Sequence, residues 1–254
     1  MITSSEIRSN ARKSLAGKWK NGVLITLVYI FFSFILQSIE RILEINAVIG
    51  LIMRIIVFII DVPIGFGFII SFIKLKRGEN VEAFDFVTDG FSNFSRAWSI
   101  SLNIILKMII PIILIIVSFV ILVNFSGVSL MRDMPDLTVP NQIGTTSPIL
   151  AVIGGLLLIA SSVYASIKGL LYSVSNFIAY DNPDMDAKSV VNESAKLMDG
   201  NRVNLFVLQL SFIGWVILGV FTLYIGYLWL IPYMQIATVY FYEALIGKDS
   251  SNEE

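Results

Sequence analysis

Long apolar runs, separated by short polar segments, dominate the chain from residue 23 to residue 245. Several runs reach the roughly 20 residues that a helix needs to cross a hydrocarbon core about 30 Å thick. The last run, 203–245, would form a helix roughly 60 Å long, so two helices joined by a turn at 222–226 are expected. The pattern predicts an all-α, polytopic membrane protein with six transmembrane helices in three hairpins. The expected spans are 23–39, 47–73, 100–123, 148–178, 203–221 and 226–245.

The Lys and Arg residues fall mainly on one side of this arrangement. Thirteen of them lie in the N-terminal segment (1–20), the 74–96 and 180–202 loops and the C-terminal tail (246–254). Only Arg41 and Arg132 lie in the opposite loops. Because Lys and Arg avoid translocated loops, both termini are expected in the cytoplasm and the protein in the bacterial cytoplasmic membrane. The expected layout is one membrane domain over 1–254.

A polar segment with a helical apolar pattern and a glycine leads into each hairpin, which indicates three repeated units. In the first segment, 5–17, Ile7, Ala11 and Leu15 form a stripe, and Thr3 and Glu6 are spaced as a capping box. The other two stripes are Phe84, Val87, Phe91, Phe94 and Trp98, and Val190, Val191, Ser194, Leu197 and Met198. The pattern predicts that a cytoplasmic amphipathic helix precedes each hairpin.

Amphipathic helices of this kind lie in the membrane interface with the apolar face toward lipid, and Trp19, Trp98 and Arg202 are the expected anchors at the headgroups. Basic segments attract anionic lipid headgroups, so one interpretation is a ring that senses lipid. The favoured alternative is that the helices only connect and anchor the hairpins, because the second segment is acidic overall. The expected partner is the lipid bilayer, including anionic headgroups, and not nucleic acid.

Four ionisable residues lie well inside the predicted spans: Arg54, Asp61, Lys107 and Lys168. Each costs about 2.5–3.5 kcal/mol at a helix centre, so a partner or a hydrated cavity is expected. Asp61, Lys107 and Lys168 all lie roughly 15–20 Å from the cytoplasmic ends of their spans. This common depth permits an Asp61–Lys107 or an Asp61–Lys168 pair, and Arg54 is expected to snorkel outward or to join through water.

Pro63 follows Asp61 in a stretch that also contains Gly65 and Gly67. Discontinuous helices build polar sites in many transporters, so one hypothesis is a cavity for an anionic solute or lipid headgroup. Its residues would be Arg54, Asp61, Pro63, Lys107 and Lys168. The favoured alternative is a structural ion pair with snorkelling lysines, in which Pro63 only kinks a long helix.

The chain contains no cysteine and no histidine. Disulfides, thiol chemistry, the usual haem and zinc ligands and an imidazole base are therefore excluded. An intramembrane hydrolase would need a second acid or base near Asp61, and Glu243 is only a weak candidate. The expectation is a non-catalytic protein without a cofactor or metal.

Several stretches together resemble the bacterial membrane proteins grouped as domain of unknown function 975. They are Gly17-Lys18-Trp19, Lys76-Arg77-Gly78-Glu79, Tyr180-Asp181-Asn182-Pro183, the run from Leu197-Met198-Asp199-Gly200-Asn201-Arg202 to Gly214-Trp215, Thr222-Leu223-Tyr224-Ile225-Gly226, Trp229, Pro232-Tyr233 and Phe241-Tyr242-Glu243. The resemblance implies an integral membrane protein, mainly of low-GC Gram-positive bacteria, with no established activity and no active site to carry over. The arrangement is also similar, more distantly, to the membrane part of some glycerophosphodiester phosphodiesterases.

These observations lead to one expectation about function and one alternative. The expectation is a lipid-interacting or envelope-associated membrane component that works without catalysis. The alternative is a small transporter or flippase for an anionic solute or lipid, with its site around Asp61. A water-accessible cavity at Asp61 would favour the alternative, and a dry ion pair would favour the first interpretation.

Overall fold

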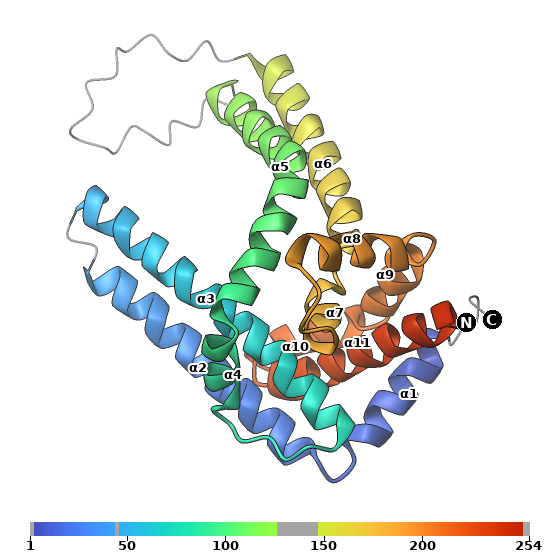
Figure 1. The fold of residues 1–254 in the computed structure, drawn as a ribbon. Coiled ribbons are helices and arrows are strands. Elements are labelled where there is room, and N and C mark those ends of the chain that lie inside the picture. The colour runs from blue at the N-terminus through green and yellow to red at the C-terminus, as the bar shows by residue number, and fades with distance from the viewer. Residues whose placement is uncertain (1–2, 44–45, 126–146, 251–254) are drawn as a thin grey trace. The chain divides into compact units, whose positions relative to one another are not determined.

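The described chain folds entirely into helices. The computed structural model describes residues 3–43, 46–125 and 147–250, and these form eleven α-helices and no β-strand (Figure 1). In chain order they are α1 (Ser4–Leu15), α2 (Trp19–Leu43), α3 (Ala47–Arg77), α4 (Asp85–Ser92), α5 (Phe94–Phe125), α6 (Pro148–Leu171), α7 (Ser175–Asp181), α8 (Ala187–Met198), α9 (Arg202–Leu210), α10 (Ile213–Phe221) and α11 (Tyr227–Ser250). The all-α fold class is confirmed. Arg132 lies outside the described residues.

The helices form two compact units. One unit comprises 1–103 together with 171–254, and the other comprises 104–170. In the second unit α5 and α6 approach closely at Gly154, where an added Cβ would lie 2.6 Å from the backbone nitrogen of Leu122. Small residues allow such close approach between helices, so Gly154 holds this pair together.

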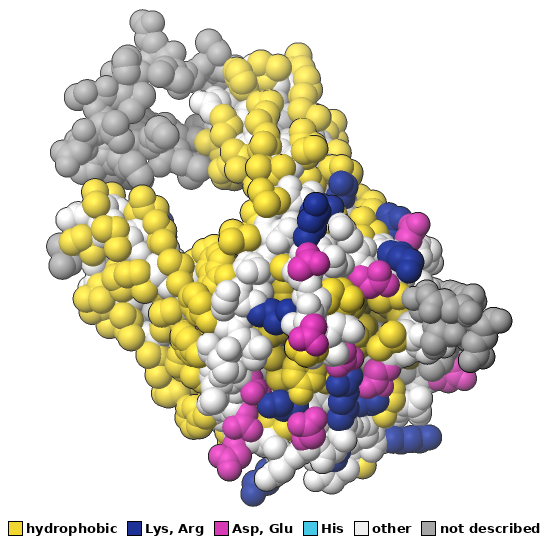
Figure 2. Space-filling view, viewed as in Figure 1, with side chains coloured by type: hydrophobic (Ala, Val, Ile, Leu, Met, Phe, Trp, Pro, Cys, Tyr) yellow, Lys and Arg dark blue, Asp and Glu magenta, His cyan; other side chains and the backbone are white. Residues whose placement is uncertain are grey.

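Five helical stretches are long and apolar enough to cross a membrane. They are Trp19–Leu43, Ala47–Arg77, Phe94–Phe125, Pro148–Asp181 and Arg202–Phe221. Large apolar side chains are exposed along these stretches, and Figure 2 shows them over the outer parts of α2, α3, α5 and α6. Such surfaces suit lipid and not water, so the chain has the character of a multi-pass membrane protein. The predicted sixth span, 226–245, lies in α11, which is not among the five.

Two of the predicted spans contain breaks that the sequence pattern does not indicate. The expected turn at 222–226 separates α10 from α11, and Leu223 and Tyr224 in it have φ of 50° and 68°. The Thr222 hydroxyl donates to the Gly219 carbonyl oxygen at 2.9 Å and accepts from the Gly226 N–H at 3.0 Å. The predicted 203–221 span is divided between α9 and α10, and the predicted 148–178 span between α6 and α7.

The predicted stripes of α1 and α8 are buried in protein and do not rest on lipid. Ile7, Ala11 and Leu15 are at most 3% exposed, and α1 packs against α11. The α8 stripe is buried as well, and this helix packs mainly against α7 and also contacts α11. The spacing of both stripes is therefore correct, but the expectation of a lipid-facing stripe is wrong for these two helices because α11 and α7 cover them.

The ends of α1 and α8 have the expected capping chemistry. Thr3 and Glu6 form the predicted capping box at the start of α1. Asp186 caps α8 by accepting from the Ser189 N–H at 3.0 Å, and hydrogen bonds from Ser189 hold the pKa of the Asp186 carboxyl below its ordinary value. Gly17 and Gly200 have φ of 80° and 74°, which lets the chain turn from each amphipathic helix into the next.

α4 packs closely on α3 at Gly90, with Phe86 buried beside this contact. A Cβ on Gly67 would lie 1.9 Å from the Phe86 carbonyl oxygen, and one on Gly90 would lie 2.3 Å from the Pro63 carbonyl oxygen. Phe86 is fully buried beside them, whereas Phe84 is 63% exposed. The predicted aromatic stripe was expected to face lipid, and the exposure of Phe84, Phe91 and Phe94 agrees with that expectation, while the small residue Gly90 faces α3.

Candidate functional site

α3 runs without interruption through the 61–67 stretch. Pro63 lies inside the helix and has no N–H to donate to the carbonyl oxygen of Ile59, four residues earlier. The indole Nε1–H of Trp98 donates to that carbonyl oxygen at 3.1 Å instead. Trp98, predicted as an interfacial anchor, thus uses its polar atom inside the protein. The discontinuous helix of the transporter hypothesis is absent from this described stretch.

Arg54 has a protein partner that the sequence did not reveal. Its Nε lies 3.2 Å from the Glu40 Oε1, so an ion pair joins α2 and α3. The expectation that Arg54 snorkels or joins through water did not include this partner. The signal that could have found it is the pair of opposite charges on the two sides of the predicted turn between these helices.

The other predicted polar residues lie in different units. Asp61 is exposed on α3 in the first unit and makes no salt bridge within that unit's described residues. Lys107 and Lys168 lie in the second unit, and the Lys168 Nζ is 5.8 Å from the ring centroid of Tyr164, one turn earlier on α6. Pairing of Asp61 with either lysine stays a prediction.

The two remaining predicted anchors also have protein neighbours. The Arg202 Nη2 lies 2.5 Å from the Asp199 Oδ1, at the start of α9. Trp19 is half-buried at the start of α2 and lines a groove described below. Position at a headgroup layer stays a prediction for both.

Three of the quoted motifs meet in one group of charged residues in the first unit, here called the motif cluster: Lys76, Arg77, Asp181, Tyr242 and Glu243. Arg77 Nη1 and Nη2 donate to the two Asp181 carboxylate oxygens at 2.7 and 2.8 Å. The Tyr242 hydroxyl donates to Asp181 Oδ2 at 3.1 Å. Glu243 pairs with Lys76 and lies 3.8 Å from the Arg77 Nε. The cluster joins the ends of α3 and α7 to α11, and Figure 2 shows acidic and basic side chains gathered on this part of the unit.

The motif cluster leaves Glu243 occupied by two cations. Both cations lie near the end of α3, so Glu243 ties α11 to that end. Glu243, the one weak candidate for an acid–base role, thus lies within a group of ion pairs. Sequence reasoning placed the three motifs at span ends but did not predict that they meet; the available signal was that they carry opposite charges at equivalent ends of predicted spans.

Arg96 performs a similar task for α7. Its guanidinium donates five hydrogen bonds of 2.5–3.1 Å to backbone carbonyl oxygens. The acceptors are Ala179, Asn182, Pro183 and Met185. The last carbonyls of a helix have no partner within it, so Arg96 satisfies the end of α7 and fixes the loop that follows.

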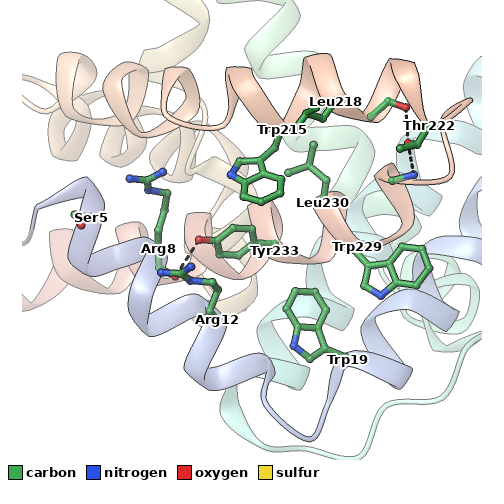
Figure 3. A pocket seen from close by; sticks show the side chains of 12 residues that line it. Ser5, Arg8, Arg12, Trp19, Trp215, Leu218, Thr222, Trp229, Leu230 and Tyr233 are labelled. Atoms are coloured by element: carbon green, nitrogen blue, oxygen red, sulfur yellow. Dashed lines mark hydrogen bonds between the residues drawn. The ribbon is translucent and has the colours of Figure 1, made fainter.

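A groove of about 700 Å³ opens between α1, the start of α2, α10 and α11, all in the first unit (Figure 3). It is here called the arginine groove. Its lining residues are Ser5, Arg8, Arg12, Trp19, Trp215, Leu218, Gly219, Thr222, Gly226, Trp229, Leu230 and Tyr233. No acidic residue is among these twelve. Figure 3 shows the two arginines on α1 at one end and the indoles toward the other.

The arginines of this groove have spare hydrogen-bond donors. Arg8 Nη1 donates to the Ser211 carbonyl oxygen at 3.2 Å, while its Nε is buried without a partner. Arg12 makes no hydrogen bond or salt bridge with the described part of the chain. The Tyr233 hydroxyl donates to the Arg8 carbonyl oxygen at 3.2 Å, which holds α1 against α11. From the sequence, both arginines are expected only to add to the positive charge of the cytoplasmic side.

Comparison with known proteins gives one match. A family model described as "Protein of unknown function (DUF975)" matches residues 1–249. No curated protein matches the chain, and no solved structure matches it. The resemblance to this family is confirmed, whereas the more distant similarity to glycerophosphodiester phosphodiesterases is not shown.

Proposed function

Since the chain belongs to the DUF975 family of proteins of unknown function, we propose that it is a lipid-interacting component of the bacterial cytoplasmic membrane that works without catalysis. The supporting observation is the extent of exposed Leu, Ile, Val and Phe side chains on α2, α3, α5, α6, α9 and α10. Residues of this kind favour contact with acyl chains over contact with water. Both termini lie in the cytoplasm in this proposal.

The distribution of polar side chains supports the non-catalytic part of the proposal. The acids of the motif cluster are paired with cations, and Lys74 pairs with Asp89 at 2.8 Å. Among the described residues, no group of three or more acids is placed to hold a metal ion. These paired groups fasten helices together.

The transporter alternative is less well supported. It relied on a helix break at Pro63 that would expose backbone groups to a cavity. α3 is continuous there, and Trp98 occupies the one carbonyl that Pro63 leaves without a donor. What still favours the alternative is the exposed Asp61 carboxylate at membrane depth.

Single cysteines test these two functions, because the chain has no native cysteine. Asp61→Cys, Lys107→Cys and Lys168→Cys are treated with a membrane-impermeant thiol reagent from each side of membrane vesicles. Val57→Cys, at a buried position, is the unreactive control, and Glu79→Cys is the reactive one. We expect only Glu79→Cys to react. Reaction at positions 61, 107 and 168, with protection by an anionic solute, would replace the proposal by the transporter.

The dependence of stability on lipid tests the lipid-interacting part of the proposal. The detergent-purified protein is stripped of lipid, its melting temperature is measured, and total membrane phospholipid is added back. We expect the melting temperature to fall on stripping and to recover on addition, because lipid binds the folded state preferentially. No change in either step would contradict a lipid-interacting function.

A further inference from the structure

We infer that the arginine groove binds one anionic phospholipid, with the phosphate at Arg8 and Arg12 and an acyl chain along the indoles. The inference rests on the proposed function and assigns a site and a lipid class to it. The groove lies wholly within the first unit, and its twelve lining residues belong to the described chain.

The positive charge in the groove has no acidic counterpart among the described residues that line it. Arg8 and Arg12 lie four residues apart, on one face of α1, where like charges repel. Within the described chain no acid lines the groove, Arg12 makes no hydrogen bond or salt bridge, and the buried Arg8 Nε has no acceptor. A phosphate accepts several hydrogen bonds and fits the planar guanidinium in a two-point arrangement. An anion at this end would remove the repulsion and supply acceptors.

The remainder of the groove is apolar, and this selects a lipid over a free ion. Trp215, Leu218, Trp229 and Leu230 follow the arginines along the lining, as Figure 3 shows. A volume of about 700 Å³ is in the range of ligand sites and far exceeds what one phosphate ion fills. Tryptophans commonly sit where headgroup meets acyl chain, because the indole has an apolar body and one N–H donor.

The tryptophans also supply the measurement. Three of the four in the chain, Trp19, Trp215 and Trp229, line the groove. Phosphatidylglycerol with a brominated acyl chain quenches nearby indoles, so it is titrated at low mole fraction into the protein in neutral detergent micelles. Brominated phosphatidylcholine, which is zwitterionic, is the comparison lipid. We expect half-maximal quenching by phosphatidylglycerol at a roughly tenfold lower mole fraction.

Neighbouring residues provide the matched variants. Arg12→Gln should abolish the preference for phosphatidylglycerol, whereas Lys13→Gln, which removes the same charge one residue away and outside the groove lining, should keep it. Arg12→Lys keeps the charge but loses the two-point geometry, and an intermediate preference is expected. Arg12 has no described hydrogen bond or salt bridge to lose, so all three variants should have the melting temperature of the unchanged protein. If Arg12→Gln does not fold, the lipid preference of Arg12→Lys decides whether Arg12 binds the phosphate.

Two results would overturn the inference. Equal quenching by both lipids, or equal loss of preference in Arg12→Gln and Lys13→Gln, would mean unselective contact with surrounding lipid. Displacement of phosphatidylglycerol by millimolar inorganic phosphate would mean that the arginines bind the free ion. Neither result would change the recovery of melting temperature by total phospholipid, so failure of this site and failure of the proposed function are distinguishable.

Discussion

At the scale of single residues, Trp98 compensates for a defect that Pro63 introduces into α3. In lipid a carbonyl without a donor costs several kcal/mol, so the indole N–H at the Ile59 carbonyl oxygen is a substantial contact. We predict that Trp98→Phe lowers the free energy of unfolding by about 1–2 kcal/mol. Thermal unfolding in mild detergent measures the change.

Pro63→Ala provides the internal check on this explanation. The alanine N–H at position 63 can donate to the Ile59 carbonyl oxygen, so Trp98→Phe should cost much less in the Pro63→Ala background. An equal cost in both backgrounds would mean that Trp98 acts through packing on Phe58, whose ring it meets edge-on at 5.5 Å, and not through its N–H.

Asp181 is the residue on which the motif cluster depends most. Its carboxylate accepts two hydrogen bonds from Arg77 and one from Tyr242. We predict that Asp181→Asn lowers the free energy of unfolding by about 1–2 kcal/mol, since the pair is partly exposed and screened by solvent. Asp184→Asn, which neutralises a nearby exposed carboxylate with no described partner, should change it by less than about 0.5 kcal/mol. Chemical denaturation of the detergent-solubilised variants measures both, and equal effects would assign the loss to net charge.

At the scale of elements, the contact of α4 with α3 depends on the absence of side chains. A Cβ at Gly67 or Gly90 would overlap a carbonyl oxygen of the facing helix, and backbone atoms cannot move aside as a flexible side chain can. We predict that Gly67→Ala or Gly90→Ala costs more than about 3 kcal/mol. Gly65→Ala, with open space around the new Cβ, should be neutral or stabilise α3 by up to about 1 kcal/mol. Yield of folded protein and melting temperature compare the three.

The same elements show what could be predicted from the sequence and what could not. The spacing of Ile7, Ala11 and Leu15 predicts both a helix and its buried face, because periodicity is a local property. It does not reveal whether lipid or protein covers that face. For α4 the stripe of large aromatics marks an exposed face, whereas the contact with α3 depends on Gly90 and on how closely the two backbones approach, which periodicity does not show.

The candidate sites were harder to predict, because they also depend on which segments pack together. Asp61, Lys107 and Lys168 were chosen by their cost at membrane depth, which is readable along the chain. Arg12 carries no such mark, because a basic residue in a terminal segment is ordinary. Its significance arises only when α1 packs against α11 and brings it beside Trp215, more than 200 residues later.

At a larger scale, α11 holds several helices of the first unit together. It packs on α1, α2 and α3 and contacts α8 and α10, and it carries Tyr242 and Glu243 of the motif cluster. Its apolar residues Ile236 and Val239 are fully buried. A helix enclosed by protein does not need an apolar surface on every side, so a low apolar content is compatible with crossing the membrane. Low apolar content alone therefore does not decide whether α11 forms the predicted sixth span.

The number of spans fixes the side on which α11 ends, and this gives the last prediction. Lys13→Cys, Ile225→Cys and Gly247→Cys place a single thiol on α1, in the turn before α11 and near the end of α11, all at exposed positions. With six spans and cytoplasmic termini, an impermeant thiol reagent added to intact cells should label only position 225, and permeabilised cells should label all three. If α11 does not cross, positions 225 and 247 must lie on one side and react alike. Labelling of 247 together with 225 in intact cells would therefore reduce the protein to five spans, and labelling of 13 and 247 without 225 would reverse its orientation.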